Sequence, residues 1–136
     1  MNEAMRVYPP VTVIGRKLTT NDDVCGYQLQ AGHSAVINIA GLHYHPAYWD
    51  NPTAFMPERF MNFDIKGGNR FVFMPFGAGP RICIGNNFAM MEMQLINAML
   101  SARVDMQLVS TYIKPIPLIT LKPGDGVMVK LQNVKA

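Results

Sequence analysis

The fold of this chain is decided by the stretch Phe76-Gly77-Ala78-Gly79-Pro80-Arg81-Ile82-Cys83-Ile84-Gly85. It combines a glycine-rich loop with a single cysteine, and it stands directly before the segment from Asn86 to Arg103. Apolar residues recur in that segment at helical spacing and cover two flanks, which predicts a long buried helix. The first flank comprises Phe88, Met91, Leu95, Met99 and Ala102, and the second comprises Ala89, Met93, Ile96 and Leu100.

Cys83 is expected at or just before the first turn of this helix. Free N–H groups and the positive end of the helix dipole favour an anion there, so the thiolate, which is the form that binds metal, is favoured. Arg81 adds a permanent cation. A single thiolate does not make a zinc site, which usually needs about three or four protein ligands. One protein thiolate is typical of a site where a cofactor supplies the other ligands of the metal, as haem does. From the residues alone, the alternative is a small buried hydrophobe in a turn.

Length and composition narrow the class of protein. The chain has 136 residues, of which 49% are hydrophobic and 15% charged, so it resembles neither a disordered tail nor a coiled coil. The net charge of +3 is spread along the chain, and no nucleic-acid partner is predicted. No apolar run reaches the roughly 18 residues of a membrane span, and no signal-peptide layout is visible. Cys25 and Cys83 are too few for a disulfide framework and are expected to be thiols.

The rest of the chain predicts short helices, strands and turns. Glu3 to Val7 is predicted to be the last turn of a helix that begins upstream, because Tyr8-Pro9-Pro10 cannot continue it. The stretch 46–80 is rich in proline and aromatic residues and is predicted to be ordered and packed without regular structure. Strands are predicted at 11–18, 24–29, 34–39, 106–109, 116–121 and 127–131, with turns at 21–23, 31–32 and 122–126 and a short helix at 40–44.

The loop at 76–85 resembles the haem-binding signature of the cytochrome P450 family, Phe-x-x-Gly-x-Arg-x-Cys-x-Gly, at every defined position. Two other stretches resemble family signatures in the right order along the chain. Glu3-Ala4-Met5-Arg6 is similar to the family's Glu-x-x-Arg, and the segment from His45 to Phe60 is similar to the region that ends in its Pro-Glu-Arg-Phe motif. The resemblance covers residues 1–136 and roughly the C-terminal third of a typical member.

For the fold, this resemblance implies mixed α and β structure. Residues 1–136 would be the C-terminal haem-binding portion of one mainly α P450 domain, not a complete domain, with the long helix at about 86–103 buried beside small sheets and hairpins. The oxygen-binding helix, with its acid-Thr pair, and the helices that roof the substrate pocket are expected upstream of Glu3.

For the site, the resemblance implies that Cys83 is the axial thiolate on the iron of haem b, with its sulfur accepting hydrogen bonds from backbone N–H groups. Phe76 would shield the sulfur from water, and Arg81 and Arg16 would pair with haem propionates. On its own, Phe76 could equally be a core aromatic and Arg16 a solvated strand residue. The cofactor-binding set is Arg16, Phe76, Gly77, Gly79, Arg81, Cys83, Ile84 and Gly85, and the metal ligand is Cys83.

Two further sets of residues follow from the resemblance. Glu3, Arg6 and Arg59 would form a buried ion triad that holds the irregular segment beneath the loop, whereas without the resemblance Glu3 and Arg6 would be taken as a weak surface pair. Substrate-lining residues would be Val11, Thr12 and Val13, and Ile116, Pro117 and Leu118, for which plain strand packing is the alternative.

The activity implied is that of a haem-thiolate monooxygenase, which inserts one oxygen atom from O2 into an apolar organic substrate. A reductase or ferredoxin would supply electrons on the side of the cysteine loop. The motif style resembles soluble bacterial members, so a cytoplasmic location is expected, although a membrane anchor in this family would lie upstream. The chain alone is expected to be inactive. The alternative is a truncated, non-enzymatic haem-binding remnant; a β-rich interaction module would require all three motif matches to be accidental.

Overall fold

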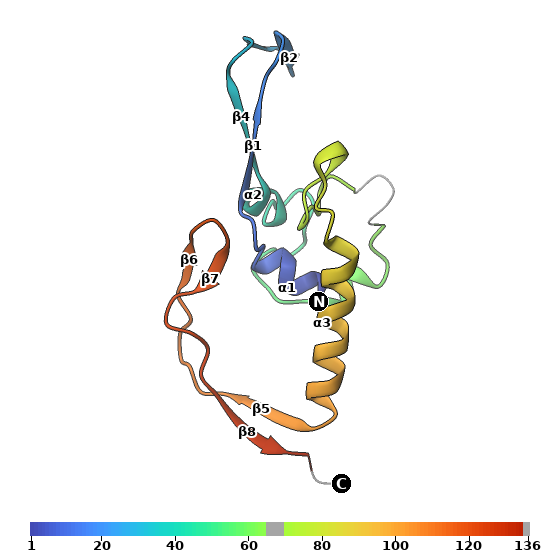
Figure 1. The fold of residues 1–136 in the computed structure, drawn as a ribbon, viewed down its shortest axis with the longest axis vertical. Helices are drawn as coiled ribbons and strands as arrows, with labels where there is room; N and C mark the ends of the chain where they lie inside the picture. The colour runs from blue at the N-terminus through green and yellow to red at the C-terminus, as the bar shows by residue number, and fades with distance from the viewer. Residues whose placement is uncertain (65–69, 135–136) are drawn as a thin grey trace.

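The computed structural model describes residues 1–64 and 70–134. Its helices are α1 (Asn2–Val7), α2 (Ile39–His43) and α3 (Asn86–Ser101), with the 3-10 turns η1 (Pro57–Phe60) and η2 (Gly79–Arg81). Its strands are β1 (Val13–Lys17), β2 (Asp22–Val24), β3 (Tyr27–Leu29), β4 (Ser34–Asn38), β5 (Val104–Leu108), β6 (Pro115–Pro117), β7 (Leu121–Pro123) and β8 (Val129–Asn133). In the described residues the strands form four two-stranded antiparallel sheets, β1–β4, β2–β3, β5–β8 and β6–β7. This mixture of helices and small sheets confirms the predicted fold class (Figure 1).

α1 ends where the prolines predict. The Tyr8 backbone N–H donates to the Ala4 carbonyl at 2.8 Å, and Pro9 and Pro10 cannot continue the helical pattern. After these prolines the chain forms β1, which pairs with β4 in a register that places Arg16 opposite Ala35. α2 follows β4 directly, and the Asn38 side chain caps it by accepting the Gly41 N–H at 2.9 Å. This helix lies one residue earlier than predicted.

The tip of the β1–β4 ladder differs from the prediction. A turn was expected at 21–23 and an unbroken strand at 24–29, and both expectations are wrong. Residues 22–24 are strand β2, and the chain reverses at Cys25 and Gly26, whose φ angles are +53° and +88°. Gly26 tolerates this left-handed conformation because it has no Cβ, so the reversal lies where the glycine is and not at the preceding Asp pair.

The core lies in the irregular segment, around Met5 from α1, Trp49 and Phe73. The rings of Trp49 and Phe63 stack with centroids 4.9 Å apart, and those of Phe60 and Phe73 approach to 4.7 Å. The prediction of an ordered, packed segment is confirmed over residues 46–64 and 70–80; residues 65–69 lie outside the described residues. Side chains, not a backbone ladder, therefore hold this part of the chain together.

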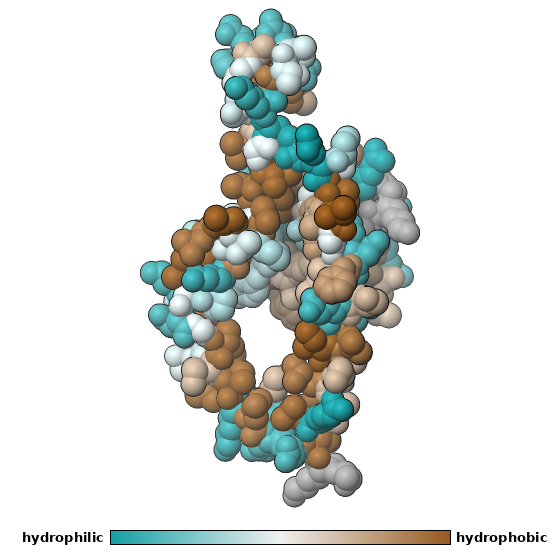
Figure 2. All heavy atoms as spheres, in the orientation of Figure 1, coloured by the Kyte–Doolittle hydropathy of each residue, from teal (hydrophilic) through white to brown (hydrophobic). Residues whose placement is uncertain are grey.

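α3 is the long helix that was predicted, and it ends at Ser101 instead of Arg103. The prediction that it is buried is wrong within this chain: none of its residues is buried, and Phe88, Met91 and Leu95 are each at least 60% exposed. Only Met90 and Met93 pack against the core, and β5 contacts the end of the helix. Figure 2 shows hydrophobic residues on the surface along this helix and along the strands beneath it.

The C-terminal strands are shorter or shifted relative to the prediction. The expected strand 116–121 is two strands, β6 and β7, which form a tight hairpin. The strands expected at 106–109 and 127–131 are β5 and β8, displaced by up to two residues, and they pair with each other. The prolines of this region fall at the ends of β6 and β7, where a ladder tolerates a missing N–H. In residues 1–64 and 70–134, no helix combines the length and hydropathy that a membrane crossing requires.

Candidate functional site

The cysteine loop is closed by its own backbone. The Cys83 N–H donates to the Phe76 carbonyl at 3.0 Å, and the Gly77 N–H donates to the Met74 carbonyl at 3.1 Å. Gly77 and Gly79 both have a φ of +73°, a conformation that residues with a Cβ rarely adopt. The two glycines therefore explain why the loop can fold back and deliver Cys83 directly to the start of α3.

Cys83 is exposed, which contradicts the alternative that it is a small buried hydrophobe. Its neighbour Ile84 is fully exposed, at 102%. A Cβ placed on Gly85 would lie 3.9 Å from Cys83 Sγ, at ordinary van der Waals distance, so Gly85 lies directly beside the sulfur. Within the described part of the chain, the backbone N–H groups of Ile84 and Gly85 have no hydrogen-bond acceptor. The sulfur and these two donors are thus available to a ligand on the outer side of the loop.

The predicted propionate-binding arginines are both exposed. Arg81 is the last residue of η2. Arg16 lies on β1, and among the described residues its guanidinium donates only to the carbonyl of Gly15, at 2.8 Å. Neither makes an ion pair with another described residue. A Cβ on Gly77 would be 4.0 Å from the Ile14 side chain, which places β1 beside the loop. Two unpaired cations are thus carried by neighbouring elements.

Phe76 is half-buried and packs against the aromatic core beneath the loop. This contact is the one expected of a core aromatic, and it anchors the first residue of the loop. The residue whose carbonyl receives the Cys83 N–H is therefore fixed by the core.

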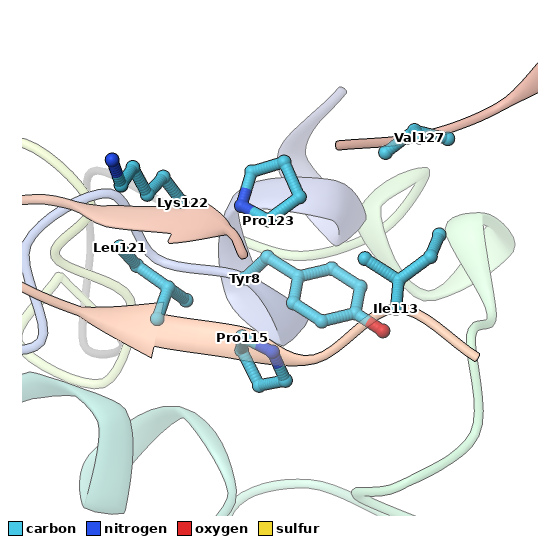
Figure 3. A pocket seen from close by; sticks show the side chains of 7 residues that line it. All are labelled: Tyr8, Ile113, Pro115, Leu121, Lys122, Pro123 and Val127. Atoms are coloured by element: carbon cyan, nitrogen blue, oxygen red, sulfur yellow. The ribbon is translucent and has the colours of Figure 1, made fainter. Parts of the chain in front are cut away.

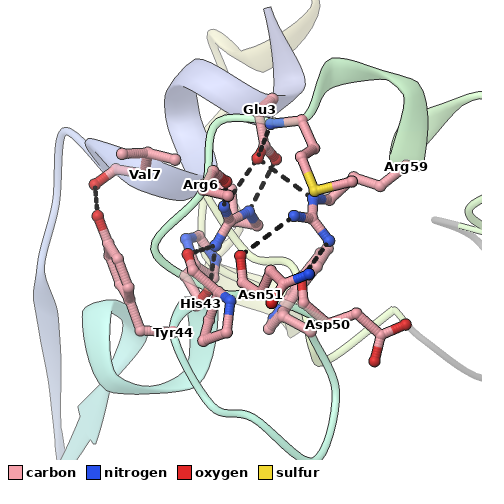
Figure 4. Close-up of polar contacts among 12 residues, drawn as sticks. Glu3, Arg6, Val7, His43, Tyr44, Asp50, Asn51 and Arg59 are labelled. Atoms are coloured by element: carbon pink, nitrogen blue, oxygen red, sulfur yellow. Dashed lines mark hydrogen bonds and ion pairs between the residues drawn. The ribbon is translucent and has the colours of Figure 1, made fainter.

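The three residues of the predicted ion triad meet in one buried cluster, shown in Figure 4. The Arg6 guanidinium donates to both carboxylate oxygens of Glu3, each at 2.7 Å. Arg59 Nε donates to Glu3 Oε1 at 3.2 Å. Side-chain exposure is 1% for Glu3, 0% for Arg6 and 11% for Arg59. The bidentate pair of Glu3 and Arg6 is therefore a buried structural ion pair and not a weak surface pair.

Backbone groups complete the cluster and tie it to the irregular segment. Arg6 also donates to the carbonyls of His43, Pro52 and Ala54 at 2.8–3.0 Å. Arg59 donates to the carbonyl of Asp50 at 2.9 Å. Every carbonyl lies in the stretch from α2 to η1, so the triad fixes a chain that has little regular structure of its own.

Electrostatics keep the Glu3 carboxyl ionised in this position. Burial alone would raise the pKa of Glu3. The hydrogen bonds from Arg6 and from the Met56 N–H, together with the charges of Arg6 and Arg59, outweigh burial and lower that pKa below 4.5. Trp49 adds a cation–π contact, with its ring centroid 5.3 Å from the Arg6 guanidinium carbon.

His43 is a residue that the sequence did not single out. It is fully buried, and its Nε2 accepts the Met74 N–H at 3.0 Å. Burial lowers the pKa of His43 to about 4, so the ring is neutral at pH 7. The sequence does carry a signal for His43. The histidine follows Leu42 and lies about one turn after Ile39 in a short apolar helix, where a buried polar ring needs a hydrogen-bond partner.

The two predicted substrate-lining stretches lie on chain segments that meet. The Leu121 N–H of β7 donates to the Pro10 carbonyl at 2.7 Å, which joins the β6–β7 hairpin to the residue just before Val11. Val13 and Leu118 are more than half exposed, and Thr12 is bound through its carbonyl to the Ala40 N–H. Whether these residues contact a substrate stays a prediction.

Two hollows lined by described residues were not predicted from the sequence. The smaller one, of about 200 Å³, lies between the end of α1 and the C-terminal hairpin, with the Tyr8 ring at its centre in Figure 3. Its lining residues are Tyr8, Ile113, Pro115, Leu121, Lys122, Pro123 and Val127. The larger, of about 680 Å³, is bordered by α1, the loop and the first turns of α3, and Phe76, Gly77 and Gly79 line it. Among the described residues, no group of three or more His, Cys, Asp and Glu side chains could hold a metal ion.

Comparison with known proteins shows which family this chain belongs to. The family profile described as Cytochrome P450 matches residues 1–129. The chain belongs to the cytochrome P450 family. The recognition made from the loop and the two other motifs is thereby confirmed.

Curated P450 relatives and solved structures agree with this assignment. "Cytochrome P450 9e2" of Blattella germanica is 37% identical over 91% of this chain and 24% of its own length. "Taurochenodeoxycholic 6 alpha-hydroxylase" of Sus scrofa is 37% identical over 98% of this chain and 27% of its own. The structure described as "Retinoic acid bound cyanobacterial CYP120A1" superposes with a TM-score of 0.88 at 30% identity, over 98% of this chain and 31% of that one. This chain thus spans about a quarter of the length of the curated relatives it matches.

Proposed function

We propose that this chain is the haem-ligating part of a P450 monooxygenase and that Cys83 is the axial thiolate ligand of the iron. The observation that carries the proposal is the exposed Cys83 on a backbone-closed loop, with two unpaired N–H groups beside it, in a member of this family. Thiolate ligation with hydrogen bonds to the sulfur is the arrangement by which a protein tunes such an iron.

The residues around Cys83 fit a haem group. The Cys83 side chain is exposed with Gly85 beside its sulfur, and the neighbouring Ile82 and Ile84 present apolar surface. Arg81 and Arg16 offer guanidinium groups, without an ion pair in residues 1–64 and 70–134, to two carboxylates. The side chains present are thus one thiolate donor, apolar contacts and two cations, and these match an iron, a porphyrin face and its propionates.

The roles of the other residues follow from their contacts. Phe76 anchors the loop to the core, and Glu3, Arg6 and Arg59 hold the irregular segment under it. When haem is bound, it supplies the redox centre at which O2 takes up two electrons and two protons, one oxygen atom entering the substrate and the other leaving as water. Val11–Val13 and Ile116–Leu118 would line the side where an apolar substrate binds, and a reductase or ferredoxin would deliver the electrons.

The proposal is tested on the protein expressed at its natural length with haem supplied. The reduced, carbon monoxide-bound protein should show the Soret band of a thiolate-ligated haem. Cys83→Ser should lose that band, whereas Cys25→Ser should keep it, because Cys25 is an exposed residue on the distant β2–β3 turn. The same band in Cys83→Ser would contradict the assignment. Thiolate-ligated haem without turnover of any substrate would favour the non-enzymatic haem-binding alternative.

A further inference from the structure

His43 is the one buried ionisable side chain in the described residues that neither the triad nor the haem ligand accounts for. Its backbone carbonyl accepts Arg6 Nη1 at 2.8 Å, which attaches it to the triad. Its Nε2 accepts the Met74 N–H at 3.0 Å, and its ring packs on Phe73 with centroids 5.2 Å apart. One residue thus contacts both the ion triad and the chain that enters the cysteine loop.

The contact continues from Met74 to the metal ligand through the backbone. The Met74 carbonyl accepts the Gly77 N–H at 3.1 Å, and the Phe76 carbonyl accepts the Cys83 N–H at 3.0 Å. Both bonds close the loop, so a displacement of Met74 changes where Cys83 lies. The path from Arg6 to the exposed Cys83 therefore runs through short contacts of buried or half-buried groups up to Gly77. Among the described residues, His43 is the only side chain that accepts the Met74 N–H.

We propose that His43 is a positioning residue that transmits the placement of the ion triad to the cysteine loop, through the hydrogen bond that its unprotonated Nε2 accepts from Met74. This inference rests on the proposed function, because the placement of Cys83 matters to a ligand only if Cys83 holds haem iron. This role requires a neutral imidazole with its proton on Nδ1. A proton on Nε2 would make Nε2 a donor that faces the Met74 N–H, and the hydrogen bond would be lost.

The surroundings of the ring favour this neutral form. Burial disfavours a charge on His43, and the nearby Arg6 guanidinium, itself paired with Glu3, disfavours a second positive charge. The backbone carbonyls of Met5 and Arg6 act in the opposite sense but do not outweigh burial. The remaining groups around the ring, Phe73 and the Met74 N–H, are uncharged. His43 Nδ1, which carries the proton in this form, is influenced by the Met5 and Arg6 carbonyls but makes no hydrogen bond of good geometry with any described group.

The direction of the pH effect follows from these contacts. The pKa of His43 lies at about 4 in the folded chain, below its ordinary value of 6.5. A group whose pKa is lowered by folding contributes stability above its unfolded value and loses it as the pH falls. The stability that the Met74 contact contributes should therefore decline as the pH falls below about 6.5. The contact itself should break, and the loop loosen, as the pH falls through about 4, where the folded ring takes up a proton.

The test compares His43→Gln, His43→Phe and the control His33→Phe, in the haem-loaded protein at its natural length. His33 is an exposed histidine on a distant turn whose ring also accepts a backbone N–H. The measured quantity is the fraction of reduced, carbon monoxide-bound haem that retains the thiolate-type band, followed as the pH is lowered. Glutamine can accept the Met74 N–H but does not take up a proton, whereas phenylalanine keeps the ring and removes the acceptor.

We expect His43→Gln to keep the thiolate-type band at pH 7 and to lose it at lower pH than the wild type does. His43→Phe should shift the ratio of thiolate-type to other haem on the order of tenfold at pH 7, because it leaves a buried N–H unsatisfied. An unchanged ratio in His43→Phe, or an acid profile of His43→Gln identical to the wild type, would overturn the inference while leaving Cys83 ligation intact. If His43→Phe does not fold, the profile of His43→Gln decides. A wild type without the thiolate-type band would overturn the proposed function and the inference with it.

Discussion

The ion triad and the cysteine loop are built in opposite ways, although both carry charged groups that the family resemblance singles out. Glu3 and Arg6 are almost wholly buried, and each polar atom of the Arg6 fork has an acceptor. Cys83, Arg16 and Arg81 are exposed, and within residues 1–64 and 70–134 the Arg16 guanidinium donates only to the Gly15 carbonyl. The difference indicates that the triad is satisfied by its own members, whereas Arg16 and Arg81 make no ion pair with another described residue.

The comparison predicts that the largest effects arise from breaking the triad. Glu3→Ala should destabilise the folded protein by about 3–5 kcal/mol, because it leaves the buried Arg6 charge without its partner. The matched control is Glu58→Ala, which removes an exposed glutamate from η1, next to Arg59. Denaturant unfolding of the protein at its natural length measures both changes. Equal stabilities of the two variants would show that the triad is not a scaffold.

Arg59 should tolerate substitution better than Arg6, because its side chain is 11% exposed and it makes a single bond to Glu3. Arg59→Lys should recover only part of the stability that Arg59→Ala loses, since lysine lacks the fork that reaches both Glu3 and the Asp50 carbonyl. The same unfolding measurement, with haem content recorded for each variant, provides the check. Full recovery by lysine would mean that charge alone matters at this position.

The uncovered face of α3 predicts that residues 1–136, expressed alone, associate. Phe88, Met91 and Leu95 are each at least 60% exposed, and covering a large apolar side chain stabilises by roughly 1.5–3 kcal/mol. Sedimentation should therefore show aggregates or a loose state that binds a hydrophobic dye. Replacing Leu95 by Glu should reduce the association, whereas Asn97→Glu on the same helix should not. A monodisperse monomer with a sharp, cooperative melt would contradict this expectation.

Acid should weaken the triad in a definite pH window. Folding lowers the pKa of Glu3 below 4.5, so its contribution to stability is fully present above pH 4.5 and is lost as the pH falls through the folded value. Thermal melting from pH 7 downward should thus show a component below pH 4.5 that is absent in Glu3→Gln. This component lies below most of the window of His43, which separates the two groups. Parallel profiles for Glu3→Gln and the wild type would contradict the assignment.

The smallest effects on stability should come from the arginines of the exposed region. Arg16→Gln and Arg81→Gln should each change the free energy of unfolding by less than about 0.5 kcal/mol, as is usual for surface substitutions. Both should nevertheless speed the transfer of haem to an acceptor protein, because each would remove one propionate partner. Lys17→Gln, on the same strand as Arg16, is the control. Unchanged haem transfer in both arginine variants would remove them from the cofactor-binding set.

The sequence predicted those features that depend on local chemistry. The proline pair ends α1, the apolar spacing yields α3, and the motif residues Glu3, Arg6 and Arg59 meet as expected. The strand boundaries were less accurate, because the turn at Gly26 and the break in the strand predicted at 116–121 depend on backbone angles and hairpin pairing that apolar patterns do not reveal.

Two other differences have causes outside local sequence. α3 was predicted to be buried from its two apolar flanks, but periodicity shows which faces are apolar and not whether anything covers them. His43 was missed because the partner of its ring is Met74, which lies 31 residues further along the chain. Contacts of such separation are set by tertiary packing, and a pattern read along the chain does not contain them.

The central claim is that Cys83 is the axial thiolate ligand of the haem iron. X-ray absorption at the iron edge of the haem-loaded protein tests it most directly. The wild type and Cys25→Ser should both show a sulfur atom in the first coordination shell of the iron. Cys83→Ser should show only nitrogen and oxygen neighbours. Sulfur retained in Cys83→Ser, or absent from the wild type, would contradict the account.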